Sequence, residues 1–336
     1  MTIAPPNQAT PGVPPPTRRS AGRRRSTLAK QEARAGLTLI SPTVIIVLVV
    51  VILPVLWTIM LSFQHIRLLT LRRAGIFGSY SLANFRDVLT SSDFRDSLRN
   101  TLVYTVFGTA LSIGVGLVAA LVVRTPFRGR TIVRASMLLP YVAPVVAMTY
   151  VWQIMLNPQF GIINHIGQSV FGWKHAVPFL SQQTGQLSLF GWHVGVPTAL
   201  ITVILFEAWR YFPFAFLFIL ARIQAIPKEL EEAARVDGAT PTQRFAHIIW
   251  PQIKPVLAVL AVLRFIWTFN KFDDVYLLTG GGAGTEVASV RVYQLLTAQA
   301  DVGASAAQAT VLAVILVVCL GVYFAFFGRN QGEEQS

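Results

Sequence analysis

The chain has 336 residues, of which 53% are hydrophobic and only 13% are charged, and its formal net charge is +13. This composition and a mean hydropathy of +0.56 exclude a soluble globular domain and indicate an integral membrane protein. The positive charge lies largely in the N-terminal segment and in short loops, without an aromatic-interleaved basic patch. We therefore expect contact with anionic membrane lipid and no nucleic-acid partner.

Residues 1–36 are rich in Pro, Ser and Arg and lack the apolar periodicity of a folded helix. They predict a disordered, basic cytoplasmic tail. The first apolar run starts after residue 36 and is long enough to span a bilayer, so it does not have the form of a cleavable signal peptide.

Six stretches reach the roughly 20 mostly apolar residues that a helix needs to cross a bilayer. They are residues 37–63, 100–123, 133–156, 198–223, 254–278 and 308–327. The sequence shows no strand alternation of the outer-membrane-barrel kind. It therefore predicts an all-α membrane protein with a transmembrane domain over 37–327 and a cytoplasmic C-terminal tail over 328–336.

The orientation follows from the basic residues that flank the spans. The N-terminal tail and the loop with Arg124, Arg128, Arg130 and Arg134 are both basic, which places them and the N-terminus in the cytoplasm. The arginines of the first outer segment, residues 65–99, run against this rule. Within that segment, residues 79–99 have helical spacing and predict an interfacial helix that leads into the second span.

A polar segment, residues 227–255, lies between the fourth and fifth apolar stretches. Pro227 suits a first helical turn, and the run Glu229–Val236 has helical character. Gly238 permits a left-handed stop at the C-terminal end of this helix. A short first helix that ends in a tight turn is therefore expected.

A second helix is expected directly after the turn. Thr240 can cap it, and Gln243 has the spacing of a capping box. We expect Pro251 and Pro255 to end this helix before the fifth span begins. We call residues 227–255 the coupling segment and expect them to form a cytoplasmic helix-turn-helix.

The coupling segment resembles the EAA loop of ATP-binding-cassette (ABC) importer permeases, with Trp250 where that family usually has Leu. The resemblance rests on Glu232-Ala233-Ala234, Asp237-Gly238-Ala239, and the spacing from there to Ile248 and Pro251. It implies that Glu232, Ala233, Ala234, Asp237, Gly238 and Ala239 couple the chain to a separate ATPase, with Glu232 as the charged contact. An acidic amphipathic helix on the membrane surface is the plainer alternative.

The run from Phe272 to Gly282, with Pro140 and residues 157–161 upstream, resembles the carbohydrate branch of these permeases, of the maltose and glycerol-3-phosphate type. Ala283 departs from it, because a Pro usually follows the glycines. Over residues 37–327 the resemblance implies a type I importer permease in the bacterial inner membrane that takes up a di- or oligosaccharide. The implied partners are a non-identical second permease, two ABC ATPase subunits and an extracytoplasmic solute-binding protein. ATP and Mg would bind only the ATPases, so we expect no cofactor, metal or catalytic residue in this chain.

Charged residues stand within the predicted spans, where each costs on the order of 2.5–3.5 kcal/mol on insertion scales. A rise of about 1.5 Å per residue places Glu207 level with Lys271, and Arg210 level with Arg264. Such residues either form ion pairs that hold the helices together or line a polar path for a hydroxylated solute. The resemblance assigns that path to Trp152, Glu207, Arg210, Tyr211, Phe214, Trp267, Asn270, Lys271 and Asp273. Carboxylates and amides bind hydroxyl groups, while flat rings cover the apolar faces of sugars.

Other functions remain open at this stage. Glycerol 3-phosphate or a polyol would suit the same residues, with a phosphate bound by Arg210, Arg264 and Lys271. A secondary transporter or channel would predict internal repeats, and no convincing repeat is visible. A membrane-embedded enzyme is the third class, but the histidines lack metal-ligand spacing and no nucleophile-base pair stands out.

Overall fold

The computed structural model describes residues 22–73, 75–76, 78–189 and 192–332. It divides into two parts, Met1–Trp57 and Thr58–Ser336, which we treat separately. In the first part, helix α1 (Gly22–Val47) runs into a π-helical turn (Leu48–Ile52) and then into α2 (Leu53–Ser62), which crosses the boundary between the parts.

The predicted disordered tail needs correction where the structure describes it. Residues 22–36 are helical in α1, and only residues 1–21 of the predicted tail lie outside the described residues. The prolines of the tail all precede residue 17, whereas residues 28–35 are mostly strong helix formers such as Leu, Ala, Lys, Gln, Glu and Arg. The helix therefore extends back well before the apolar run.

Within the described residues, five helices are long and apolar enough to cross a membrane, and one bent pair can supply a sixth span. The single helices are Gly36–Ser62, Ser92–Val122 (α4), Thr198–Gln224 (α8), Pro241–Phe269 and Val302–Ala325 in α14 (Val302–Gly332). The pair is α5 (Arg130–Val142) with α6 (Val145–Met155), bent by 98°. This confirms the prediction of an all-α membrane protein.

The bend between α5 and α6 has a local cause. Ala143 precedes Pro144 and adopts an extended backbone, because a residue before proline avoids the helical region. Pro144 also has no N–H with which to continue the hydrogen bonding of α5. The predicted third span is therefore a broken span.

The start of the second span differs from the prediction. Residues 79–99 do not form one interfacial helix, because α3 (Ala83–Thr90) ends at Ser91 and α4 begins at Ser92. The Ser91 hydroxyl accepts a hydrogen bond from the Phe94 N–H at 3.4 Å and so caps α4. Only α3 remains separate from the span.

The fifth span was predicted wrongly at both ends. It runs from Pro241 through α10 (Pro241–Arg244), a π-helical turn (Phe245–Ile249) and α11 (Trp250–Phe269), so Pro251 and Pro255 do not interrupt it. Pro251 lies in the first turn of α11 directly after the π-helical turn, a position where a missing N–H is tolerated. At the other end the helix stops at Phe269, and α12 (Asp273–Thr279) is a separate element.

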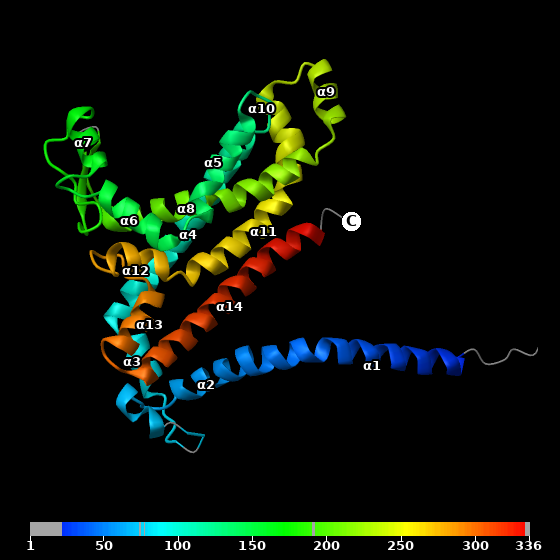
Figure 1. The fold of residues 1–336 in the computed structure, drawn as a ribbon, viewed down its shortest axis with the longest axis vertical. Coiled ribbons are helices and arrows are strands. Elements are labelled where there is room, and N and C mark those ends of the chain that lie inside the picture. The colour runs from blue at the N-terminus through cyan, green and yellow to red at the C-terminus, as the bar shows by residue number, and fades with distance from the viewer. Residues whose placement is uncertain (1–21, 74, 77, 190–191, 333–336) are drawn as a thin grey trace, which may run out of the picture. The chain divides into compact units, whose positions relative to one another are not determined.

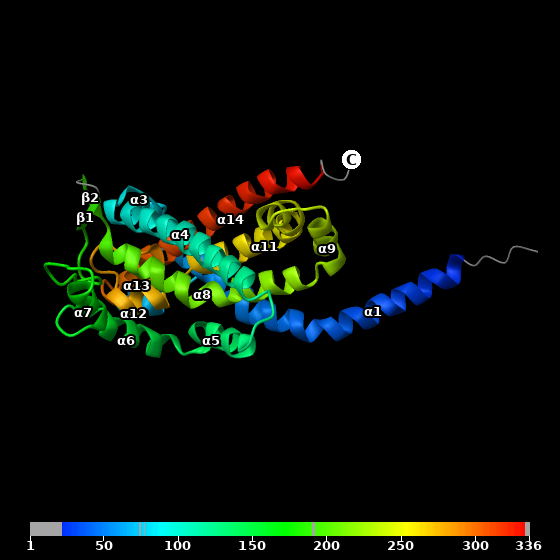
Figure 2. The ribbon, with the colours of Figure 1, turned by 90° about the horizontal axis from the view of Figure 1, so that it is seen from above.

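In the second part, α8 packs against α4, α5 and α11 (Figures 1 and 2). Gly116 of α4 makes a close approach possible, since a Cβ there would lie 2.8 Å from the Phe216 backbone nitrogen and 3.0 Å from the Phe212 carbonyl oxygen. Small residues at helix contacts allow such backbone packing in membranes. Buried side chains of both helices, including Ala120 and Ile219, continue this contact.

Short helices lie near both ends of α8. Helix α9 (Lys228–Val236) lies at one end, and α6 and α7 (Ile162–Ser169) lie toward the other (Figures 1 and 2). The remaining short elements are a 3-10 helix (Leu68–Arg73), a hairpin of β1 (Gly185–Leu189) and β2 (Trp192–Val196), and α13 (Ala288–Thr297). Helix α14 continues to Gly332, so the predicted C-terminal tail is helical over 328–332, and its last residues lie outside the described ones.

Candidate functional site

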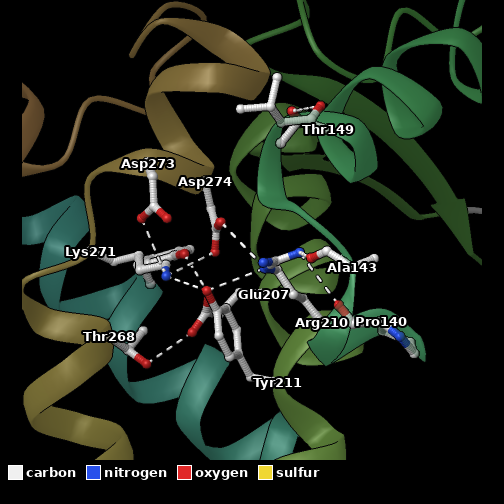
Figure 3. A network of polar contacts seen from close by, with 12 residues as sticks. Pro140, Ala143, Thr149, Glu207, Arg210, Tyr211, Thr268, Lys271, Asp273 and Asp274 are labelled. Carbon is white, nitrogen blue, oxygen red and sulfur yellow. Dashed lines mark hydrogen bonds and ion pairs between the residues drawn. The ribbon is translucent and has the colours of Figure 1, made fainter. Parts of the chain in front are cut away.

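A network of polar side chains lies where α4, α8, α11 and α12 meet (Figure 3). Helix α8 contributes Glu207, Arg210 and Tyr211 from one face, because positions three and four apart are neighbours on a helix. The other members are Tyr104, Arg264, Thr268, Lys271, Asp273 and Asp274.

Glu207 is fully buried, and both oxygens of its carboxylate accept hydrogen bonds. Its Oε1 accepts a short hydrogen bond from the Arg264 guanidinium and one from the Thr268 hydroxyl at 3.0 Å. Its Oε2 accepts a hydrogen bond from the Tyr104 hydroxyl at 3.0 Å. Gly108 makes room for it, since a Cβ there would lie 3.0 Å from the Glu207 Cγ. The pair with Arg264 therefore ties α4, α8 and α11 together inside the bundle.

Arg210 connects α8 to the break between α5 and α6. Its Nη1 donates to the Ala143 carbonyl oxygen at 3.2 Å and to the Pro140 carbonyl oxygen at 3.4 Å. In an unbroken helix the Pro140 carbonyl would accept from the N–H of residue 144, but residue 144 is a proline. The arginine thus satisfies a carbonyl that the broken span leaves without its helical partner.

Asp274 is the most deeply buried acid of α12, with no exposed side-chain area. Its oxygens lie 3.6 Å from the Lys271 ammonium and 3.9 Å from the Arg210 Nε, and neither oxygen has a hydrogen-bond partner among the described residues. Asp273, by contrast, has 44% of its side chain exposed, 3.2 Å from Lys271. Of these two adjacent carboxylates, Asp273 can be reached from outside in this conformation, while Asp274 is closed off.

Tyr211 forms the aromatic centre of the network. Its ring centroid lies 4.4 Å from the Lys271 ammonium and 4.5 Å from the Arg264 guanidinium carbon, both suitable for cation–π attraction. Its hydroxyl also makes a short hydrogen bond with Lys271. The two cations are thus stabilised by a ring as well as by carboxylates.

The other predicted path residues lie around this network or apart from it. Phe214 packs on the half-exposed Trp267 with ring centroids 5.0 Å apart. Trp152 belongs to a separate aromatic cluster with Phe206 and Trp209. Asn270 is exposed and its amide donates to the Ile266 carbonyl of its own helix.

Sequence reasoning missed parts of the network. The depth count set Glu207 level with Lys271, whereas its ion-pair partner is Arg264. Asp274 was left out of the predicted path in favour of Asp273, although its spacing of three residues from Lys271 is a signal for an ion pair. Tyr104 lies among apolar residues and threonines, and no sequence signal points to its contact with Glu207.

The turn of the coupling segment has the local geometry that its sequence predicts, whereas its second helix continues into the fifth span. Gly238 is left-handed with φ +78°, and Thr240 and Gln243 form a complete capping box. Helix α9 spans Lys228–Val236, close to the predicted run. Glu232, Ala233, Asp237 and Gly238 are exposed, while Ala234 and Ala239 are half-buried. The segment therefore presents an acidic and small-residue surface at one end of the bundle.

The sequence of this chain is similar to those of known membrane-transport proteins. Residues 112–331 match the family described as "Binding-protein-dependent transport system inner membrane component". The chain is 33% identical over 281 residues to the inner membrane ABC transporter permease protein YcjO of Escherichia coli (strain K12), covering 84% of this chain and 90% of that protein. It is 32% identical over 310 residues to the trehalose/maltose transport system permease protein MalF of Thermococcus litoralis, covering 90% and 97%.

A solved structure shares the fold. A chain from the crystal structure of a bacterial ABC transporter involved in the import of the acidic polysaccharide alginate superposes with a TM-score of 0.72 at 22% identity, covering 91% of this chain and 99% of that chain. The residues that match the family include the coupling segment and most of the polar network.

Proposed function

We propose that this chain, which belongs to the family of binding-protein-dependent transport system inner membrane components, is the permease subunit of an ATP-driven importer that takes up a sugar. The observation that carries the proposal is the coupling segment, in which α9 and a left-handed turn at Gly238 lie between two membrane-spanning helices, the second of which begins at the capping box of α10. Its exposed residues Glu232, Ala233, Asp237 and Gly238 would contact an ATPase subunit, with Ala234 and Ala239 beneath them.

The rest of the assembly follows from this role. A solute-binding protein would deliver the sugar on the outer side, and a second, non-identical permease would complete the path. Two ATPase subunits would bind ATP and Mg and hydrolyse ATP, so that this chain contributes no catalytic residue. The coupling segment, and with it the N-terminus, would then lie in the cytoplasm.

The polar network supports a solute path that is closed in this conformation. Glu207 and Arg264 form a buried ion pair with further partners on neighbouring helices, so we propose that they hold the bundle together. Contact with the solute would fall to Asp273, Lys271 and Trp267, which retain exposed area next to the network. Opening of α12 away from α8 would add Asp274 to these groups. Trp152, Arg210, Tyr211, Phe214 and Asn270 remain in the proposed path, as supporting or flanking residues.

The charges of the network favour a neutral solute. Arg210, Arg264 and Lys271 each have a carboxylate within 4.0 Å, so none of these cations is available to a phosphate without breaking an ion pair. Glycerol 3-phosphate is the second candidate, because a relative 33% identical over 258 residues is the sn-glycerol-3-phosphate transport system permease protein UgpA of Rhizobium meliloti. A sugar such as a disaccharide needs only hydroxyl acceptors and ring faces, which the network has.

Co-purification tests the assembly directly. The chain is tagged, extracted gently from its own membrane, and its partners are identified by mass spectrometry. The proposal predicts an ATPase, a second permease and a solute-binding protein, whose bound ligand then identifies the solute. Recovery of this chain alone, from an extraction that keeps other transporters intact, would favour a secondary transporter or channel instead.

A further inference from the structure

Two adjacent glutamates of α9 lie in different surroundings. Glu232 is exposed on the outer surface of the coupling segment. Glu231 has only 21% of its side chain exposed, and its Oε2 accepts a hydrogen bond from the Arg124 Nη2 at 2.8 Å. The same oxygen lies 4.0 Å from the Arg244 Nη1. Neighbouring positions on a helix point about 100° apart, so one acid can face a partner protein while the other faces its own chain.

The Glu231 carboxylate joins three segments of the chain. Arg124 lies in the turn between α4 and α5, Glu231 in α9, and Arg244 at the end of α10. Arg124 and Arg244 have 20% and 13% of their side chains exposed, and each retains buried N–H groups without another partner among the described residues. Both cations therefore depend on one carboxylate, and its removal would leave two guanidinium groups facing each other.

The turn that carries Arg124 is itself firmly held. Arg130 donates to the Val123 carbonyl at 2.7 Å and to the Arg124 carbonyl at 2.9 Å, and Arg134 donates to the Val123 carbonyl at 3.2 Å. These bonds close the turn onto the end of α4. A force on the Arg124 side chain would therefore act on α4 as a whole.

Helix α4 connects this turn to the polar network. Its backbone packs directly on α8 at Gly116, and at Gly108 it lies against Glu207. Farther along α4, Tyr104 donates to the Glu207 carboxylate. A displacement of α4 at Arg124 is thus carried to the groups that close the proposed solute path.

The covalent link between α8 and α9 would not be sufficient to transmit movement of α9 to the polar network. Only residues 225–227 join the two helices, and Pro227 has an extended backbone with φ −56° and ψ 131°. Helix α9 could swing about such a short link while α8 stayed in place. The ion pair gives α9 a direct attachment to α4, in addition to its covalent links to α8 and α10.

We propose that Glu231, held by Arg124 and Arg244, is a positioning residue that transmits movement of the coupling segment to α4 and α8, whereas Glu232 serves contact with the ATPase. This inference rests on the proposed function, because it needs an ATPase that moves the coupling segment. In this proposal, the turn between α4 and α5, which carries Arg124, transmits movement during transport.

The test uses the complete transporter reconstituted in lipid vesicles, with sugar uptake and ATP hydrolysis measured together. Glu231→Gln and Arg124→Gln each remove one charge of the pair while keeping the side-chain shape. The matched control is Arg128→Gln in the same turn, an exposed position outside the coupling segment. Recovery of ATPase subunits and thermal stability are recorded for every variant.

We expect Glu231→Gln and Arg124→Gln each to lower the uptake per ATP hydrolysed by about threefold or more, with ATPase recovery unchanged and the Arg128→Gln control at the wild-type ratio. Because the two residues act as one unit, the double variant should be no worse than either single variant. The exchanged pair Arg124→Glu with Glu231→Arg should regain part of the lost ratio.

Three results would overturn the proposal. A wild-type ratio for Glu231→Gln would show that the ion pair transmits nothing. Loss of ATPase subunits from that variant would make Glu231 an ATPase contact, and fully multiplicative losses in the double variant would show that the residues act separately. If the wild-type chain itself recovers no ATPase, the proposed function fails and the inference fails with it.

Discussion

The polar network around Glu207 and the coupling segment both depend on charged residues, but the protein holds the two regions in opposite ways. In the network, each cation meets a carboxylate inside the bundle, and the central pair is fully buried. In the coupling segment, the shape comes from backbone geometry at Gly238 and from a capping box, with most side chains exposed. Changes at the buried ion pair of the network should therefore affect the stability of the bundle, whereas changes in the coupling segment should affect transport in a folded protein.

The largest effect is expected at the buried pair. Arg264→Met should destabilise the bundle by about 3–5 kcal/mol, because Glu207 would remain as a buried charge without its cation. Thermal unfolding of the purified chain in detergent measures this. The double variant Glu207→Gln with Arg264→Met removes both charges and should recover much of the lost stability. A single variant as stable as wild type would contradict the structural role of the pair.

The second effect concerns the turn of the coupling segment. Gly238→Val should leave the chain folded in the membrane but abolish uptake that depends on ATP, because a branched side chain is strained at φ +78°. Gly238→Asn is the matched control, since asparagine tolerates a left-handed backbone better than other side chains. Normal uptake by the valine variant would show that the turn geometry is unimportant for coupling.

A smaller effect is expected at Asp273, the exposed acid of the network. Asp273→Asn should raise the KM for uptake by about threefold, the size of one weakened hydrogen bond, without affecting assembly. Uptake measured over a range of sugar concentrations would show this. An unchanged KM together with lower stability would instead favour a role for Asp273 in holding Lys271.

The smallest effect is expected at the capping box. Thr240→Ala removes the side chain that caps α10 and should destabilise this local turn by about 1 kcal/mol, so uptake should fall only slightly. Hydrogen exchange of the amides at the start of α10 reports the change. Protection equal to wild type would show that the rest of the helix already fixes this end.

Features that depend on neighbours in sequence could be predicted. The left-handed Gly238 and the pair Thr240 and Gln243 follow from local spacing and are present as expected. The apolar spans follow in the same way from composition. The effect of the prolines was harder to predict. Pro251 was expected to end the helix, but it is tolerated because a π-helical turn precedes it, and no local sequence pattern predicts that turn.

Features that depend on helix rotation could not be predicted. Counting depth along straight helices set Glu207 level with Lys271, whereas the packing of α8 on α11 brings it to Arg264. The family resemblance assigned Asp273 and not Asp274 to the path, although the direction in which each acid points is decided only by the start of α12 at Asp273. The link between Glu231 and Arg124 likewise joins positions 107 residues apart.

The most direct test of the central claim is sugar uptake by lipid vesicles that contain this chain with its co-purified partners. Labelled di- and oligosaccharides are supplied with the solute-binding protein outside, and ATP is enclosed inside. The account predicts accumulation that requires both ATP and the binding protein and that is lost in Gly238→Val. Uptake that proceeds without ATP, or in vesicles that contain this chain alone, would contradict it.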